Sequence, residues 1–277
     1  MSVPRIKTIA ITALILINAF FGAVIIIDTT ADVSNERQAI ENICALMRSN
    51  GIELSPDNVK INSSLRQMRT TRALESEEII ARALLDTVTI TDQGIIYLYE
   101  NPQRGTAEFY SAGDFEIRLN KGVVSNANGT LTTVEGVLRD MKLESSVLTV
   151  AMGQETETVI AVGAYRGANI FNCMIEFVFS EGSLETIRGR YVGGIEPTED
   201  DTRISQVGTA LLDFLAWSKR EGVECTHIFG VEAGYQHRVA GSYGEGVITP
   251  AWLITTDKAR YLIDGTTGDI WPVAQTA

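Results

Sequence analysis

The chain has 277 residues, of which 45% are hydrophobic, and its formal net charge is −12 at pH 7. This charge argues against a nucleic-acid partner, because such binding needs clustered Lys and Arg to neutralise phosphates. Cys44, Cys173 and Cys225 are too widely spaced to predict a metal site, and nothing in the sequence selects a disulfide pair among them. We expect three buried or half-buried thiols that act as small hydrophobic groups.

An apolar run fills residues 6–27, with Lys7 as its one charged side chain. A helix of this length crosses a hydrocarbon core about 30 Å thick. Arg5 and Lys7 lie at the N-terminal end of the run and Asp28 follows it, which predicts that the tail of residues 1–5 is cytoplasmic and that the remaining chain is extracellular. A cleaved signal peptide and a buried core helix are the alternatives. The run is longer than a signal core and apolar on all sides, so we expect a retained anchor in the cell membrane.

Beyond Lys7 at its start, Asn18 is the one strongly polar side chain within this predicted span. An amide in lipid forms interhelical hydrogen bonds that stabilise a helix pair by about 1 kcal/mol. It can also bond to its own backbone, and the sequence leaves both possibilities open. The residues that we predict to bind a partner within the membrane are Asn18, Ala19, Phe20 and Gly22.

The first half of the remaining chain alternates between helix and strand patterns. Residues 33–49 are predicted to be a helix because Ile40, Ile43, Cys44 and Met47 form one apolar stripe. Residues 60–72 are polar and predict a loop. Further elements in chain order are a strand at 52–54, a helix at 76–86, and strands at 94–99, 106–110 and 115–119.

The second half repeats this pattern. A helix is expected at 132–142, with Thr132 and Glu135 as a capping box. Another is expected from a Thr198 cap to Gly222, with Glu199, Asp200 and Asp201 in its first turn. Strands are expected at 147–152, 159–165, 169–179, 183–191, 227–238, 247–256 and 259–263. These elements predict an α+β fold: a transmembrane helix followed by repeated helix-on-antiparallel-sheet units, in domains at 28–120 and 121–277.

No pattern of catalytic residues stands out, so we expect a protein that is not an enzyme and has no cofactor. His227 and His237 lie about 33 Å apart along one strand, too far to share a metal. The glycine-rich loop 241–246 leads into a strand rather than a helix, unlike a phosphate-binding loop. The turn 264–269 could bind calcium, but a plain turn explains it better. Four aromatic residues are predicted to be in the core rather than at a partner site: Trp217, Trp252, Trp271 and Tyr235.

Three parts of the chain resemble the YycH/YycI family. The first is Arg5-Ile6-Lys7-Thr8-Ile9 followed by residues 14–20, which is similar to the opening of YycI-type proteins. The second is residues 94–119. The third is residues 249–254 and 261–269, which look like the closing hairpin of YycH/YycI and of PepSY-like modules. The glycine-rich residues 241–246 and the low Lys content depart from the family pattern.

The resemblance implies a regulatory role. YycH and YycI are single-pass proteins of Gram-positive bacteria that associate with the sensor histidine kinase YycG (WalK), which controls cell-wall metabolism. They modulate this two-component system, with the transmembrane helix as a main contact. By resemblance we expect such a kinase, the membrane and a YycH-like protein as partners. The alternative is a PepSY-like anchored inhibitor or chaperone of a cell-envelope hydrolase, acting through the hairpin at residues 252–269.

Overall fold

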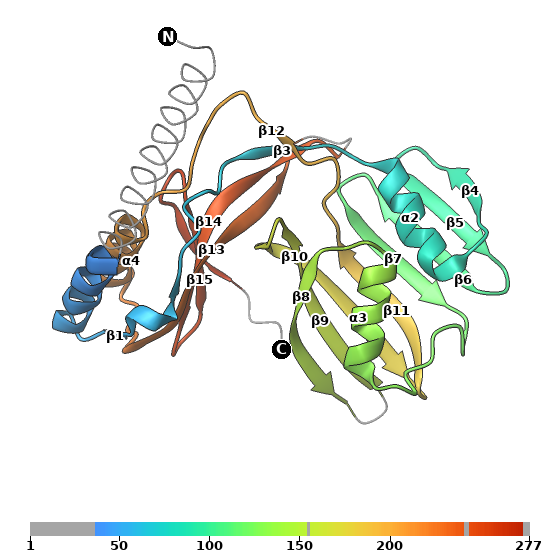
Figure 1. The fold of residues 1–277 in the computed structure, drawn as a ribbon, viewed down its shortest axis with the longest axis horizontal. Helices are drawn as coiled ribbons and strands as arrows, with labels where there is room; N and C mark the ends of the chain where they lie inside the picture. Colours follow the sequence, from blue (N-terminus) through green and yellow to red (C-terminus); the bar gives the residue numbers. More distant parts are fainter. Residues whose placement is uncertain (1–36, 154–155, 241–243, 274–277) are drawn as a thin grey trace, which may run out of the picture.

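The computed structural model describes residues 37–153, 156–240 and 244–273. These residues form a mixed α+β fold dominated by β-sheet, with helices packed on the sheets (Figure 1), so the prediction of an α+β fold is confirmed. One path of hydrogen-bonded strands runs β12-β3-β14-β13-β10-β11-β7-β6-β5-β4. Two large hydrophobic cores lie along this path. We name them after the chain that forms them: the middle unit (residues 71–191) and the terminal unit (residues 37–70 and 192–273).

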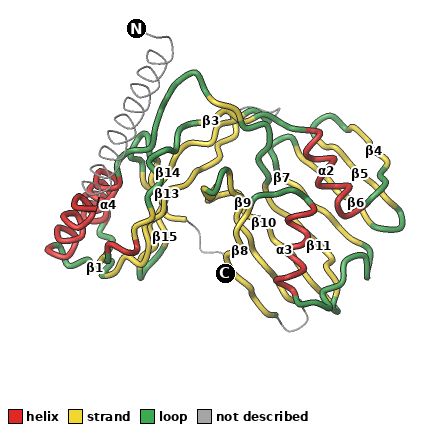
Figure 2. The backbone as a smooth tube through the Cα atoms, in the orientation of Figure 1, coloured by secondary structure: helices red, strands yellow, loops and turns green. Residues whose placement is uncertain are grey.

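The middle unit is an antiparallel sheet with helices on one face (Figure 2). Phe115, Ile117 and Leu119 alternate with polar residues and are buried beneath the helices, as their spacing predicts. The helices are α2 (Leu74–Leu85) and α3 (Thr130–Asp140). The strands in sheet order are β8 (Ser145–Met152), β9 (Thr156–Tyr165), β10 (Ala168–Ser180), β11 (Ser183–Arg190), β7 (Asp114–Leu119), β6 (Gly105–Tyr110), β5 (Ile96–Asn101) and β4 (Thr89–Asp92).

The terminal unit is a second sheet that carries the helix of residues 37–49 and α4 (Val207–Glu221) on one face (Figure 1). Its central strand is β14, which pairs with β13 on one side and with both β15 and β3 on the other. Besides the 3-10 helix η1 (Pro56–Asn58), its elements are β1 (Glu53–Leu54), β2 (Val59–Lys60), β3 (Met68–Thr70), β12 (Glu196–Pro197), β13 (His227–Val239), β14 (Gly246–Thr256), β15 (Arg260–Asp264) and β16 (Ile270–Val273).

The middle unit is inserted into the terminal unit between two short strands. β3 leads into it and β12 leads out of it, and the two pair antiparallel, with Arg69 opposite Glu196. An ion pair of 2.9 Å joins these two side chains. The boundary predicted at residue 120 therefore lies within one core, because Leu119 and Val134 both belong to the middle unit. Hydrophobic periodicity locates elements, but it does not tell which of them share a core.

The helix predicted to begin at Thr198 begins instead after Gln206, the N-cap of α4. The preceding residues bond to other segments: Gln67 N–H donates to Thr202 O, and Ile204 N–H donates to Leu65 O. Asp201 forms ion pairs with arginines rather than lying in a first helical turn. Tertiary backbone bonds here replace the helix that the sequence favours locally.

Smaller corrections concern a helix cap and short strands. No side chain caps α3, whose N-cap is Gly129, so the predicted Thr132–Glu135 capping box is wrong. β3 lies within the predicted loop at 60–72, β2 ends at the first residue of that loop, and β4 and β16 were not predicted. These strands have two to four residues, too few to show a period.

Candidate functional site

The predicted partner-binding residues Asn18, Ala19, Phe20 and Gly22 lie outside the described residues, as does the whole span 6–27. Within the part of the chain that the structure describes, no helix is long and apolar enough to cross a membrane. The role of these four residues stays a prediction.

The helix of residues 37–49 follows the predicted span and is fixed to the terminal unit. Ile40, Ile43, Cys44 and Met47 are buried in its core, as their spacing predicts. Burying a side chain of this size contributes about 1.5–3 kcal/mol, so the four together hold the helix firmly on the sheet. The end of this helix also contacts α4, because Lys219 Nζ donates to Asn50 Oδ1 at 2.5 Å.

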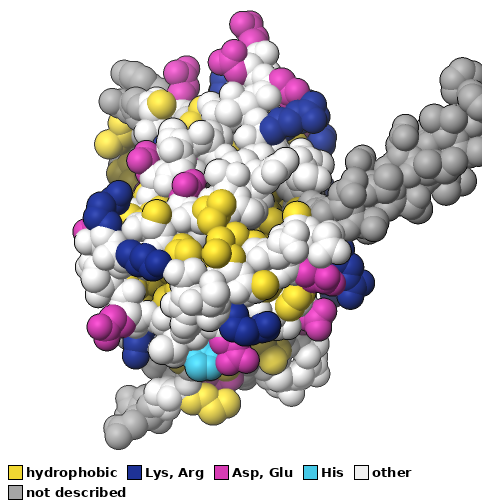
Figure 3. Space-filling model, turned by 90° about the vertical axis from the view of Figure 1, so that its left-hand side faces the viewer, with side chains coloured by type: hydrophobic (Ala, Val, Ile, Leu, Met, Phe, Trp, Pro, Cys, Tyr) yellow, Lys and Arg dark blue, Asp and Glu magenta, His cyan; other side chains and the backbone are white. Residues whose placement is uncertain are grey.

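The outer side of these two helices carries apolar side chains. Leu46 is 40% exposed and Leu212 is 46% exposed. Leu46 lies about one turn before Asn50, and Leu212 about two turns before Lys219, so both lie near the line where the helices meet. Apolar side chains gather in the middle of this face of the molecule (Figure 3). We call Leu46, Leu212 and the exposed Ala39 and Ala216 the helix-pair surface.

A bulge in β10 joins the two units. The pairing of β10 with β9 shifts register between Asn169 and Met174. At this bulge β10 leaves one core for the other: Ile170 and Cys173 belong to the terminal core, and Ile175 belongs to the middle core. The backbone of β10 meets that of β13 at one bridge, between Ile170 and Tyr235.

The Asn172 side chain completes this junction. Its Oδ1 accepts from the His237 N–H at 2.8 Å, and its Nδ2 donates to His237 O at 2.7 Å. One amide thus satisfies both backbone groups of His237, as a neighbouring strand would. The sequence analysis missed this residue. A signal is nevertheless present, because the adjacent apolar residues Ile170 and Phe171 interrupt the alternation of the strand and indicate a bulge.

The two histidines differ in burial. His237 is buried, with Nε2 3.2 Å from Thr70 Oγ1, and its Nδ1 has no hydrogen-bond partner among the described residues. Burial, together with the nearby Arg190 guanidinium, lowers the pKa of His237 to about 4. His227 is exposed, and its Nε2 lies 3.2 Å from Glu53 Oε2. The two imidazoles therefore have separate surroundings.

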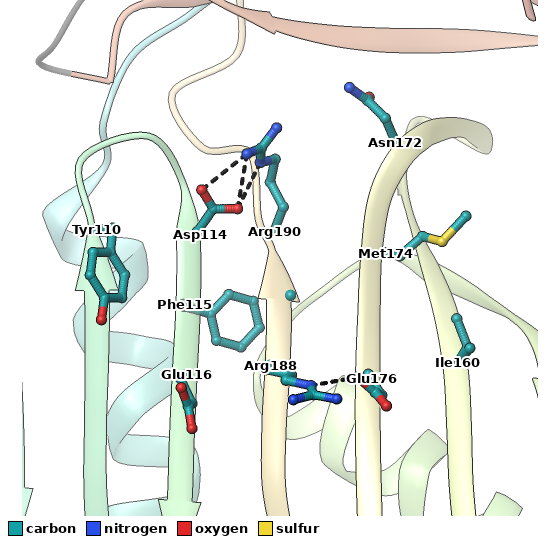
Figure 4. A pocket seen from close by; sticks show the side chains of 11 residues that line it. Tyr110, Asp114, Phe115, Glu116, Ile160, Asn172, Met174, Glu176, Arg188 and Arg190 are labelled. Atoms are coloured by element: carbon teal, nitrogen blue, oxygen red, sulfur yellow. Dashed lines mark hydrogen bonds and ion pairs between the residues drawn. The ribbon is translucent and has the colours of Figure 1, made fainter. Parts of the chain in front are cut away.

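The middle sheet has an open polar face on the side away from α2 and α3, with a shallow cleft of about 690 Å³ (Figure 4). Arg190 bonds to both oxygens of Asp114 at 3.0 Å, and Arg188 Nε donates to Glu176 Oε2 at 2.5 Å. Both arginines thus have a carboxylate partner inside the cleft. The cleft is therefore not a specialised anion site, and a polar interaction surface is the function that it can support.

The other sequence candidates have structural roles. The Asp264 side chain is buried and accepts from Thr266 N–H, Thr266 Oγ1, Thr267 N–H and Arg238. Although burial alone would raise its pKa, these hydrogen bonds hold the pKa below the usual value. Both carboxylate oxygens accept from protein donors, so the plain-turn interpretation of 264–269 fits better than calcium. No three His, Cys, Asp or Glu side chains of the described residues are grouped to bind a metal.

The remaining candidates are mostly buried. Trp252 and Tyr235 are in the core, whereas Trp217 and Trp271 are half-buried. The three cysteines are buried free thiols, as predicted. Burial raises the pKa of Cys173 to about 12, so this thiol is protonated and unreactive at neutral pH. Only part of the glycine-rich loop 241–246 lies within the described residues.

No family model matches the sequence, and no curated protein sequence matches it. Several solved structures are similar to parts of this chain, including the following two. An uncharacterized protein from Eubacterium rectale ATCC 33656 is similar with a TM-score of 0.50 and 10% sequence identity, over 78% of this chain and 89% of that chain. The C-terminal domain of YpeB from Bacillus megaterium is similar with a TM-score of 0.34 and 13% identity, over 74% of this chain and 100% of that chain. These comparisons give no evidence for the YycH/YycI family, so that resemblance stays an expectation.

Proposed function

We propose that this chain is a non-enzymatic, single-pass membrane protein that binds and modulates a two-component sensor histidine kinase. Its extracellular part is the fold described above, and its transmembrane helix at residues 6–27 makes the main contact. Asn18 is the side chain that gives this contact its specificity, because an amide in lipid seeks an interhelical partner.

One observation carries the proposal: the helix of residues 37–49 is packed in the terminal core through Ile40, Ile43, Cys44 and Met47. Only residues 28–36 separate this helix from the end of the predicted span. Even when fully extended, these residues reach only about 30 Å. A change in the position of the span therefore acts on a rigid body rather than on a loose tail. This arrangement supports regulation, in which the extracellular part and the membrane contact influence one another.

The helix-pair surface favours a partner that also lies at the membrane. Leu46 is exposed on the helix of residues 37–49, which follows the predicted span in the sequence, and Leu212 is exposed on α4. An apolar strip between two helices suits a third helix laid along it. A kinase whose transmembrane helix continues outside the membrane would present such a helix at this height.

Co-purification tests the proposal. Full-length tagged protein is extracted from membranes of the source bacterium, and the co-purified proteins are identified by mass spectrometry. We expect a sensor kinase with the wild type and at least a fivefold smaller yield with Asn18→Leu, which corresponds to about 1 kcal/mol. Thr12→Leu, another polar-to-apolar change in the predicted span, is the matched control and should retain the kinase.

A second experiment separates the proposal from its alternative. The proposal requires that the presence of this protein changes the output of the kinase. Replacement of residues 6–27 by an unrelated span should abolish that change. A secreted form without residues 1–36 that keeps full activity in the cell would overturn the proposal. That outcome would favour the inhibitor or chaperone of a cell-envelope hydrolase instead.

A further inference from the structure

β8 is an edge strand of the middle sheet. It pairs with β9 on one side, and no described strand pairs with its other side. Its sequence, Ser145–Met152, contains no charged residue and no proline. Natural edge strands usually carry such residues, because a free row of backbone N–H and C=O groups is a template for another strand. β8 lacks this protection.

The opposite edge of the same sheet is protected. β4 has four residues, Thr89–Asp92, all of them exposed, and it ends in a charged residue. Asp92 accepts from the Gly94 N–H and from the Tyr97 hydroxyl, which turn the chain back at once. An edge this short and charged offers little to an incoming strand. The contrast singles out β8.

The hydrogen-bond pattern shows which backbone groups of β8 are free. Gly153 N–H donates to Thr156 O at the hairpin, and Ala151 lies opposite Thr158. In an antiparallel ladder, hydrogen-bonded and non-hydrogen-bonded pairs alternate. Val150 and Met152 are therefore in non-hydrogen-bonded pairs with β9, and their N–H and C=O groups point to the free side. The register shift between Val147 and Thr149 leaves this second half of the strand regular.

Two side chains of this half form an exposed apolar patch at the edge of the sheet. Val150 pairs with the buried Val159, so it lies on the helix side of the sheet, where Met152 also lies. Val150 is 38% exposed and Met152 is 82% exposed. An added strand would place apolar side chains at alternate positions beside them and extend the middle core.

The acidic residues near Met152 indicate which charge the ligand carries at that end. Glu157 lies opposite Met152 and accepts a hydrogen bond from Thr130 Oγ1. A hollow of about 260 Å³ beside Met152 is also lined by Glu181, whose carboxylate is paired with Lys121, so among the described residues Glu157 is the carboxylate without a basic partner here. The whole chain has a net charge of −12. An acidic segment would be repelled here, and a basic residue would be attracted. In an antiparallel addition, the N-terminal end of the incoming strand lies next to Met152.

We propose that the free edge of β8 binds an extended segment of another protein, which adds an antiparallel strand to the middle sheet. This segment carries apolar residues at alternate positions and Lys or Arg at its N-terminal end. The site lies on the middle unit, so it is distinct from the membrane contact and from the helix-pair surface. Main-chain hydrogen bonds supply the affinity, and the alternate side chains supply the specificity.

The test uses the full-length protein in detergent and a labelled probe peptide, Lys-Lys-Thr-Val-Thr-Val-Thr-Val-Thr, with binding followed by fluorescence anisotropy. Val150→Pro removes one outward N–H and leaves the ladder to β9 intact, because proline is tolerated where a strand faces solvent. We expect about tenfold weaker binding of the peptide to this variant. Val150→Ala keeps the N–H and should bind within about threefold of the wild type.

Two further peptides test the chemistry of the ligand. Replacing the two lysines by glutamates should weaken binding severalfold, and placing a proline at the central valine should abolish it. Val150→Lys tests the same edge should Val150→Pro fail to fold. The proposal would be overturned if Val150→Pro and Val150→Lys bound the peptide as tightly as the wild type. It would also be overturned if the wild type did not bind the peptide at millimolar concentration. A dimer in light scattering that Val150→Pro dissociates would also overturn it, because the occupant would then be a second copy of the chain.

Discussion

The two units differ in how the chain builds them, and the difference indicates which one depends on the other. The middle unit is one continuous stretch in which the successive strands β4, β5, β6 and β7 are neighbours, as are β8, β9, β10 and β11. The terminal unit combines residues 37–70 with residues that follow the middle unit. Its core cannot form until these two pieces meet. Local hairpins form early, whereas pairing across a long loop carries a closure cost.

The largest predicted effect follows from this difference. A fragment of residues 71–191 should fold by itself, whereas a fragment of residues 192–277 should remain unfolded, because it lacks β1, β2, β3 and the buried helix of residues 37–49. Circular dichroism and the dispersion of amide signals in an NMR spectrum measure both outcomes. If the fragment of residues 192–277 shows a cooperative thermal transition, the two units are built more alike than we infer.

The same difference explains what could be predicted from the sequence. The hairpins of the middle unit follow from alternation, as in Phe115, Ile117 and Leu119, and the buried stripe of residues 37–49 follows from helical spacing. Both signals are local. The insertion of one unit into the other is not local, because it depends on β3 and β12, which have only three and two residues.

The candidate surfaces were less predictable than the fold. Asn172 acts through its contact with His237, which lies 65 positions away in the sequence. β8 is an edge strand because no other described strand pairs with its second side. The sequence of β8 itself contains no pattern that predicts this. The predicted helix start at Thr198 shows the converse, because a strong local signal was overridden by backbone bonds to Gln67 and Leu65.

The entry to the middle unit supplies the next largest effect. Arg72 and Glu77 form a buried ion pair with bonds of 2.7 and 2.9 Å, and the Glu77 side chain is only 2% exposed. Arg72→Met leaves this carboxylate buried without its partner, which should lower the free energy of unfolding by about 3–5 kcal/mol. Urea denaturation measures the change.

A matched control lies on the same helix. Arg82 pairs with Glu78 in an exposed i, i+4 ion pair, and Arg82→Met should cost at most about 0.5 kcal/mol. If Arg72→Met lowers the free energy of unfolding no more than Arg82→Met does, the ion pair at the start of α2 does not stabilise the middle unit.

Asn172→Ala should loosen the contact between the units. It removes both bonds to the His237 backbone and leaves those groups without their partner, at a cost of about 2–3 kcal/mol. Trp217, Trp252 and Trp271 all lie in the terminal unit, so tryptophan fluorescence reports on that unit alone, whereas far-ultraviolet circular dichroism reports on both.

Wild-type unfolding should give coincident curves by the two probes, and Asn172→Ala should shift the fluorescence curve to lower denaturant. Asn120→Ala removes one exposed bond to Pro102 O and should leave the curves together. Coincident curves for Asn172→Ala, at whatever stability, would show that the β10 backbone alone couples the units.

The smallest effect concerns the terminal side of this junction and depends on pH. Burial holds the pKa of His237 at about 4 in the folded state, below the value of 6.5 for a free imidazole. The unfolded chain therefore binds the proton more readily, and the free energy of unfolding should fall as the pH drops from about 6.5 towards 4. Between pH 7 and pH 5 the loss amounts to about 2 kcal/mol.

His237→Gln should remove most of this dependence on pH, and His227→Gln, which removes an exposed imidazole, controls for the loss of a histidine. Urea denaturation at the two pH values measures the slope. If His227→Gln reduced the pH dependence of the free energy of unfolding more than His237→Gln did, His237 would take up its proton without disturbing the junction. The contact between the units would then tolerate a charge.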